Sequence, residues 1–155
     1  MIRRNRFGIV AAAAALGVAT LAVITLGGCT LQAPSGVEDE EARERFVALL
    51  DDTQEAAGGS WSVRDDPTPR ECMIPLWVTG ERFPALRLAD APASPARAAD
   101  RVEEAWRAHD LEVTLTEVSD VIELKGESAQ GELLLFRASD SAMTLTGESE
   151  CRPVA

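Results

Sequence analysis

The side chain best suited to catalysis in this sequence is His109, the single histidine. One histidine cannot build a multi-histidine metal site, so its possible chemistry is general acid or base catalysis. That role needs a nucleophile and an orienting carboxylate. Asp110 and many serines are available, but no Gly-x-Ser-x-Gly segment presents a serine for attack. We therefore expect His109 at a helix C-terminus, where its charge is favoured, and no catalytic residue. A hydrolase that pairs His109 with a serine is the alternative.

Acidic groups are the next candidates, for calcium binding. They occur at 38–41, Asp51-Asp52 and Asp65-Asp66. None has the spaced ligands and terminal glutamate of an EF-hand loop. We expect a solvated acidic surface, with no metal and no cofactor.

The sequence has three tryptophans, and each could contribute to a ligand groove. Trp61, Trp77 and Trp106 offer large flat apolar faces of the kind that bind sugars or lipids. The sequence is otherwise poor in aromatic residues, which favours a role in the core. A pocket between helices and sheet is the alternative.

The first of three cysteines, Cys29, follows a segment typical of an export signal. Residues 1–6 carry three arginines, and residues 7–26 are apolar or small. The tetrad Leu26-Gly27-Gly28-Cys29 then resembles the lipobox of bacterial lipoproteins. That resemblance implies a diacylglycerol on the Cys29 thiol and cleavage between Gly28 and Cys29. Two acyl chains hold a protein stably on a membrane.

An uncleaved membrane-spanning helix is the alternative, because 20 apolar residues reach the length that spans a bilayer. Both interpretations place the remaining chain outside the cytoplasm. We expect a signal peptide at 1–28, a lipid-anchored tether at 29–37 and a single domain at 38–155.

The other two cysteines, Cys72 and Cys151, form an even pair in an oxidising compartment, where disulfides persist. We expect them to be bonded. A bridge over 79 residues contributes at most about 4.5 kcal/mol in the loop-entropy model. Two free thiols are the alternative.

The charge of the exported chain excludes some partners. Removal of Arg3, Arg4 and Arg6 with the signal changes the formal charge from −11 to −14. So acidic a chain is repelled by nucleic-acid backbones and by anionic lipid headgroups. We expect no nucleic-acid binding and no electrostatic adsorption to membranes.

Periodicity predicts two amphipathic helices. The first covers about 38–57 and ends at Gly58-Gly59, and the second begins at Ser94-Pro95 and covers about 95–109. Alternating runs then predict a four-stranded antiparallel meander from residue 111 to residue 146.

Earlier strands are expected at 60–64, at 72–79, where Pro75 indicates an edge or a bulge, and at 85–89. The apolar run Leu133–Phe136 predicts a central strand covered on both faces. The fold class is therefore α+β, an antiparallel sheet with two helices packed on one face.

The exported part combines a helix and a glycine-rich break, Trp61, Cys72, Trp77, a second helix and a closing Ser149-Glu150-Cys151-Arg152. In these features it resembles the small actinobacterial lipoproteins typified by mycobacterial LppA. The resemblance implies an extracytoplasmic lipoprotein with a Cys-Cys bridge. We expect a non-enzymatic binding or interaction domain on the outer face of the cell membrane, with an unknown protein or a small apolar ligand as partner. A purely structural envelope component is the alternative.

Overall fold

The computed structural model describes residues 39–76 and 78–153. The predicted signal peptide, Cys29, the tether and Trp77 lie outside these residues. The elements in chain order are α1 (Asp39–Ala57), β1 (Trp61–Val63), β2 (Arg70–Ile74), β3 (Val78–Arg82), β4 (Pro84–Asp90), α2 (Pro95–Ala108), β5 (Glu112–Val118), β6 (Val121–Glu127), β7 (Leu133–Ala138), β8 (Ala142–Glu148) and β9 (Arg152–Pro153).

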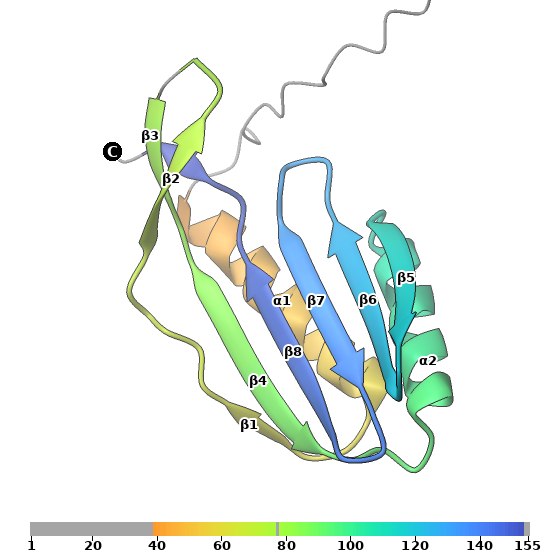
Figure 1. The fold of residues 1–155 in the computed structure, drawn as a ribbon. Helices are drawn as coiled ribbons and strands as arrows, with labels where there is room; N and C mark the ends of the chain where they lie inside the picture. Colours follow the sequence, from red (N-terminus) through yellow and green to blue (C-terminus); the bar gives the residue numbers. More distant parts are fainter. Residues whose placement is uncertain (1–38, 77, 154–155) are drawn as a thin grey trace, which may run out of the picture.

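The main sheet has six antiparallel strands in the order β1-β4-β8-β7-β6-β5, and a smaller sheet has the order β2-β3-β9. Both helices lie on the same face of the main sheet, and Figure 1 views the molecule from the other face. The predicted α+β class with helices on one face is confirmed. Among the described residues, no helix combines the length and the apolar character needed to cross a membrane.

The core fills the layer between the helices and the main sheet. Trp106 of α2, Phe46 and Leu50 of α1, and Leu134 and Phe136 of β7 are each at most 2% exposed. Ser94 caps α2 by accepting a hydrogen bond from the Arg97 N–H, and Pro95 occupies the first turn. The two helices therefore form where capping and apolar spacing predict them.

The structure corrects the prediction of one strand over 72–79. The chain instead forms a hairpin of β2 and β3, in register from Arg70 opposite Arg82 to Ile74 opposite Val78. The turn begins at Pro75, and Leu76 within it has a positive φ of 74°. β2 is an edge strand of the small sheet, as expected, but it ends at Ile74, because proline cannot donate to a ladder and Pro75 lies in the turn.

The prediction for Leu133–Phe136 is also wrong in part. β7 lies inside the sheet between β6 and β8, but the helices cover only one of its faces. Leu134 and Phe136 are fully buried on that face, while Leu133 and Leu135 are partly exposed on the other. A continuous apolar run therefore does not mean cover on both sides here. We call the face without helices the open face.

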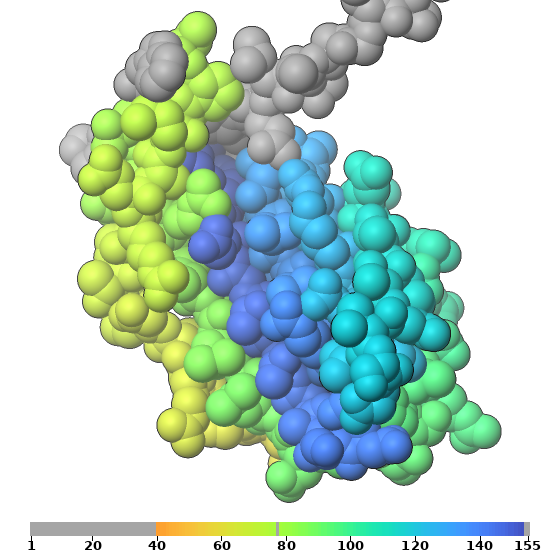
Figure 2. Space-filling model, viewed as in Figure 1, coloured from red at the N-terminus to blue at the C-terminus, as the bar shows by residue number. Residues whose placement is uncertain are grey.

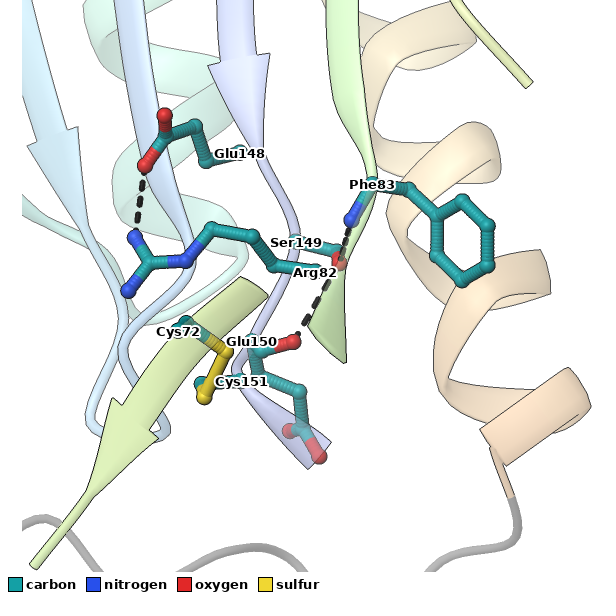
Figure 3. Close-up of a disulfide and its surroundings, with 7 residues drawn as sticks. All are labelled: Cys72, Arg82, Phe83, Glu148, Ser149, Glu150 and Cys151. Carbon is teal, nitrogen blue, oxygen red and sulfur yellow. Dashed lines mark hydrogen bonds and ion pairs between the residues drawn. A yellow bond between two sulfur atoms is a disulfide. The ribbon is translucent and has the colours of Figure 1, made fainter. Parts of the chain in front are cut away.

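The small sheet is fixed to the end of the main sheet by a disulfide. Cys72 of β2 and Cys151, just before β9, are bonded with their Cα atoms 6.0 Å apart (Figure 3). Beside the bridge, the Phe83 N–H donates to the Ser149 hydroxyl at 2.8 Å. Gly80 of β3 lies so close to β9 that an added Cβ would come within 2.5 Å of the Arg152 carbonyl oxygen. The hairpin is thus held firmly at its base.

Candidate functional site

The candidate site is a groove of about 410 Å³ on the open face. Its floor is Leu86 of β4, Leu133 and Leu135 of β7, and Thr146 of β8. Its wall is the segment that runs from β1 to the first residue of β2, which carries Arg64, Asp66 and Arg70. In Figure 2 the yellow-green part of the chain stands beside the blue strands, and the groove lies between them. Its volume is within the range of small-molecule sites.

The apolar floor exists because β4 turns its arginine toward the helices and its neighbouring leucine toward the open face. Apolar burial alone would turn Leu86 and Leu88 inward and Arg87 outward. In the structure Arg87 is 2% exposed on the helix side, whereas Leu86 is 38% exposed on the open face. Arg87 lies opposite Leu145 of β8, and Leu86 lies opposite Thr146. This register supplies the groove with a leucine.

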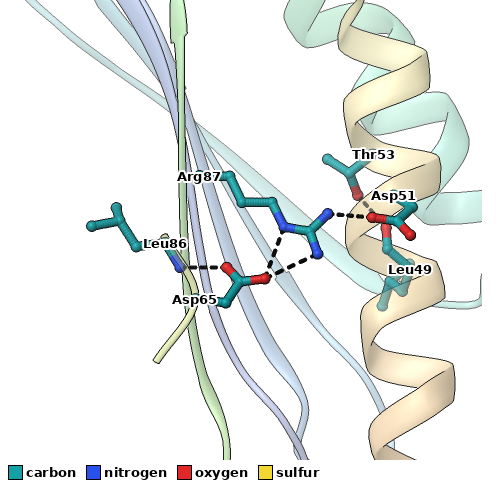
Figure 4. Close-up of polar contacts among 6 residues, drawn as sticks. All are labelled: Leu49, Asp51, Thr53, Asp65, Leu86 and Arg87. Carbon is teal, nitrogen blue, oxygen red and sulfur yellow. Dashed lines mark hydrogen bonds and ion pairs between the residues drawn. The ribbon is translucent and has the colours of Figure 1, made fainter. Parts of the chain in front are cut away.

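Two carboxylates balance the buried Arg87 (Figure 4). Its Nε and Nη2 donate to Asp65 Oδ2 at 3.2 and 3.1 Å. Its Nη1 donates to Asp51 of α1. A buried cation without such partners would be costly, so the two aspartates permit this orientation of β4. Asp51 and Asp65 are therefore ion-pair partners of a core arginine. Asp51 is still 63% exposed, as a solvated acidic surface predicts, whereas Asp65 is only 26% exposed.

Asp65 also holds the groove wall against the sheet. Its second oxygen, Oδ1, accepts from the Leu86 N–H at 3.0 Å. The next residue, Asp66, accepts from the Thr68 N–H at 2.9 Å and closes a short turn. This hydrogen bond holds the pKa of the exposed Asp66 carboxyl below its ordinary value. The wall is thus a polar turn anchored at one aspartate.

Two arginines line the groove although the whole chain is acidic. Arg64 and Arg70 both line it, and within residues 40–76 and 78–153 neither side chain has a hydrogen bond or an ion pair. Of the two carboxylates at the groove, Glu148 already accepts from Arg82 Nη1 at 2.6 Å. Asp66 lies near Arg70. Two guanidinium groups above an apolar floor suit a ligand that is apolar at one end and anionic at the other.

His109 lies far from this groove, on the helix side. It is the C-cap of α2, as expected, and its Nε2 is 3.1 Å from Asp52 Oδ2 on α1. Both side chains are about half exposed. The carboxylate beside His109 is thus Asp52 rather than Asp110, and none of the hydrogen bonds found in the described part of the chain joins His109 to a serine. In that same part of the chain, no three His, Cys, Asp or Glu side chains gather as metal ligands do.

Two of the tryptophans belong to the helix side as well. Trp106 is fully buried, and its Nε1 donates to the Thr53 hydroxyl at 2.8 Å. Trp61 packs against the core, and its Nε1 donates to the Gly58 carbonyl at 3.0 Å. Neither lines the groove, and Trp77 lies outside the described residues. A pocket between the helices and the sheet was the alternative expectation, but Trp106 fills that layer where it packs. The groove lies on the other face of the sheet.

Sequence reasoning did not find the groove residues. Arg64 and Arg70 come from a turn-forming segment, and Leu86, Leu133 and Leu135 read as ordinary strand residues. One available signal was the pattern Ala85-Leu86-Arg87-Leu88-Ala89, in which a single arginine alternates with leucines. The aspartates that bury Arg87 are 36 and 22 residues away, so the pattern alone could not reveal which face is inside.

Comparison with known proteins supports the fold. No protein-family model and no curated protein sequence matches this chain. The crystal structure of a DUF4853 family protein from Actinomyces odontolyticus ATCC 17982 is similar to it, with a TM-score of 0.58 and 17% identity over 80% of this chain and 75% of that chain. At this identity the likeness is one of fold, and function has to be argued from the site. The chain therefore shares its α+β architecture with that protein.

Proposed function

We propose that this chain is a lipid-anchored protein of the extracytoplasmic face of the cell membrane, and that its domain binds a small amphipathic anion in the open-face groove. The groove carries the proposal: Leu86, Leu133 and Leu135 form an apolar floor beneath two arginines without ion-pair partners in the described chain. Apolar lining with a few placed polar groups is the usual make-up of a small-molecule site.

Two features support the location. The Leu26-Gly27-Gly28-Cys29 tetrad has the residue types of a lipidation site. The Cys72–Cys151 bridge is of the kind that persists outside the reducing cytoplasm. The resemblance to small actinobacterial lipoproteins agrees with both, and the lipid on Cys29 is then the attachment to the membrane.

We favour binding over hydrolysis because His109 contacts Asp52 on the side of the sheet away from the groove. A general base must lie within hydrogen-bond reach of the proton that it removes. A purely structural envelope role remains the competing proposal, and ligand binding distinguishes the two.

The ligand test uses a fluorescent fatty acid, which joins an apolar chain to one carboxylate, with the corresponding alcohol as the uncharged probe. Leu86→Ser should weaken binding of both probes about tenfold. Val47→Ser is the matched control, because Val47 on α1 has nearly the same exposure, 39% against 38%. Arg64→Gln should weaken binding of the acid and leave that of the alcohol unchanged. Equal binding by all three variants and the unaltered chain would refute the groove as the site.

The anchor is tested separately. Cells that express the full chain are grown with a labelled fatty acid. The unaltered protein should take up the label, and Cys29→Ser should take up none and keep its signal peptide. Label on the serine variant would show that Cys29 is not the lipidated residue.

A further inference from the structure

The tip of the β2–β3 hairpin carries the most exposed large apolar side chain of the described residues. Leu76 is 86% exposed, Met73 54% and Val78 44%. The whole run from Cys72 to Gly80 contains no charged residue, although 26% of the chain is charged. Trp77 belongs to this run in the sequence and lies outside the described residues. Single exposed apolar side chains are common, but a charge-free projecting turn of this kind marks an interaction site.

The hairpin projects from a rigid base. The disulfide ties Cys72 to the segment before β9, and Gly80 and Glu81 pair with Pro153 and Arg152 of that strand. Charged residues begin immediately below the tip, where Glu71 lies opposite Glu81. The hairpin is therefore apolar at its end and charged at its base, a distribution that suits a boundary between an apolar phase and water.

The tip lies at the end of the domain where the anchored chain enters. α1 starts, in orange in Figure 1, at the same end as β2, β3 and β9. Contacts near this start agree: Arg43 stacks on the Phe83 ring at 4.7 Å, and Arg45 Nη2 lies 3.9 Å from Glu150 Oε2. The first turns of α1 are thus packed beside the base of the hairpin.

The length of the tether limits how far this end can move from a membrane. Cys29 and Asp39 are ten residues apart, which even fully extended spans at most about 35 Å. α1 itself, with 19 residues, extends about 28 Å away from that entry point. A lipid on Cys29 therefore holds the start of α1, and with it the hairpin end, within about 35 Å of the bilayer, so the tip can reach the bilayer surface. The β5–β6 turn lies at the opposite end of the sheet (Figure 1).

We propose that the hairpin tip, Met73, Leu76 and Val78, inserts into the interfacial region of the bilayer to which Cys29 anchors the chain, and so fixes the orientation of the domain. This proposal rests on the lipid anchor proposed above. A leucine with a positive φ and 86% exposure is costly in water, and an apolar phase offsets the exposure. Because the tip carries no charge and the chain is acidic, insertion requires no anionic lipid.

The inserted orientation has a consequence for the groove. Pro84, Leu133 and Glu148 line it at the ends of β4, β7 and β8 that face the hairpin. With the tip in the bilayer, this end of the groove opens toward the membrane surface, from which an amphipathic anion could enter.

The test is photocrosslinking of the purified, lipid-anchored full-length product in phosphatidylcholine vesicles. A photoreactive phenylalanine analogue replaces Leu76 in one variant and Met73 in a second. The control variant carries it at Val118, which is 63% exposed in the last position of β5, beside the far turn. We expect lipid adducts at positions 73 and 76, none above background at 118, and the same yield at low and high salt.

Each other outcome has a definite meaning. Lipid adducts at all three positions or at none, in protein that carries the fatty-acid label on Cys29, would overturn insertion of the tip and leave the anchor intact. An adduct between two copies of the chain at position 76 would assign the tip to self-association and would also overturn the proposal. If Cys29 is unlabelled but positions 73 and 76 still yield lipid adducts, the anchor fails and tip insertion stands. Unfolding midpoints of the variants verify that the probe leaves the fold intact.

Discussion

Replacement of Trp106 by alanine should be among the most destabilising single changes in this domain. The indole is fully buried, contacts the core from α2, and donates to Thr53, whose hydroxyl in turn donates to the Leu49 carbonyl at 2.7 Å. Loss of a large buried aromatic costs about 3–5 kcal/mol. The free energy of unfolding of a domain of this size is about 5–15 kcal/mol in total. The variant should therefore lose a large part of its stability and be folded only marginally.

Urea unfolding of the mature, unlipidated chain measures this cost. With a typical dependence on urea, the midpoint should fall by about 2 M. Trp106→Phe is the matched control, because it keeps an aromatic ring and loses mainly the N–H bond to Thr53. The urea midpoint of Trp106→Phe should fall much less than that of Trp106→Ala. An unchanged midpoint for Trp106→Ala would refute the assignment of this side chain to the core.

The remaining predictions concern packing, redox state and pH. An added Cβ at Gly126 would lie 2.6 Å from Trp106 Cε3, so Gly126→Ala should lower the free energy of unfolding by about 1–3 kcal/mol. A double-mutant cycle should show a smaller loss when Trp106 is already alanine. Mass analysis after alkylation without reductant should find Cys72 and Cys151 unmodified, and two modified thiols there would contradict the bridge. Burial raises the pKa of the Glu132 carboxyl, so its contribution to stability is lost as the pH rises through that pKa. Glu132→Gln should therefore raise the urea midpoint at neutral pH relative to the unaltered chain and change it little in acid; an equal effect at both pH values would contradict this.

Local sequence signals predicted the regular elements well where one physical cause dominates. The cap and proline at Ser94-Pro95 start α2, and Gly58 and Gly59, both with positive φ, end α1. The β5–β8 meander forms where short alternating or apolar runs, separated by turn residues, predict strands. The hairpin at 70–82 was misjudged because Pro75 is compatible with an edge strand, a bulge or a turn.

The candidate site was beyond sequence reasoning for a different reason. The inward direction of Arg87 depends on Asp51 and Asp65, which approach it from α1 and from the segment after β1. No local pattern shows that two distant carboxylates will meet one guanidinium. Once they do, Leu86 must face outward, since successive strand residues point to opposite faces.

The amino-acid sequence alone is enough to predict the α+β class, the two helices and the strands of an antiparallel sheet, because capping, periodicity and turn chemistry act over a few neighbouring residues. It also determined which cysteines were available to pair. Three further features depend on the folded chain: β7 is covered on one face alone, Arg64 and Arg70 line a groove with exposed leucines, and the β2–β3 tip shares an end with the start of α1. These features arise from contacts between segments far apart in the chain, which the folded backbone brings together.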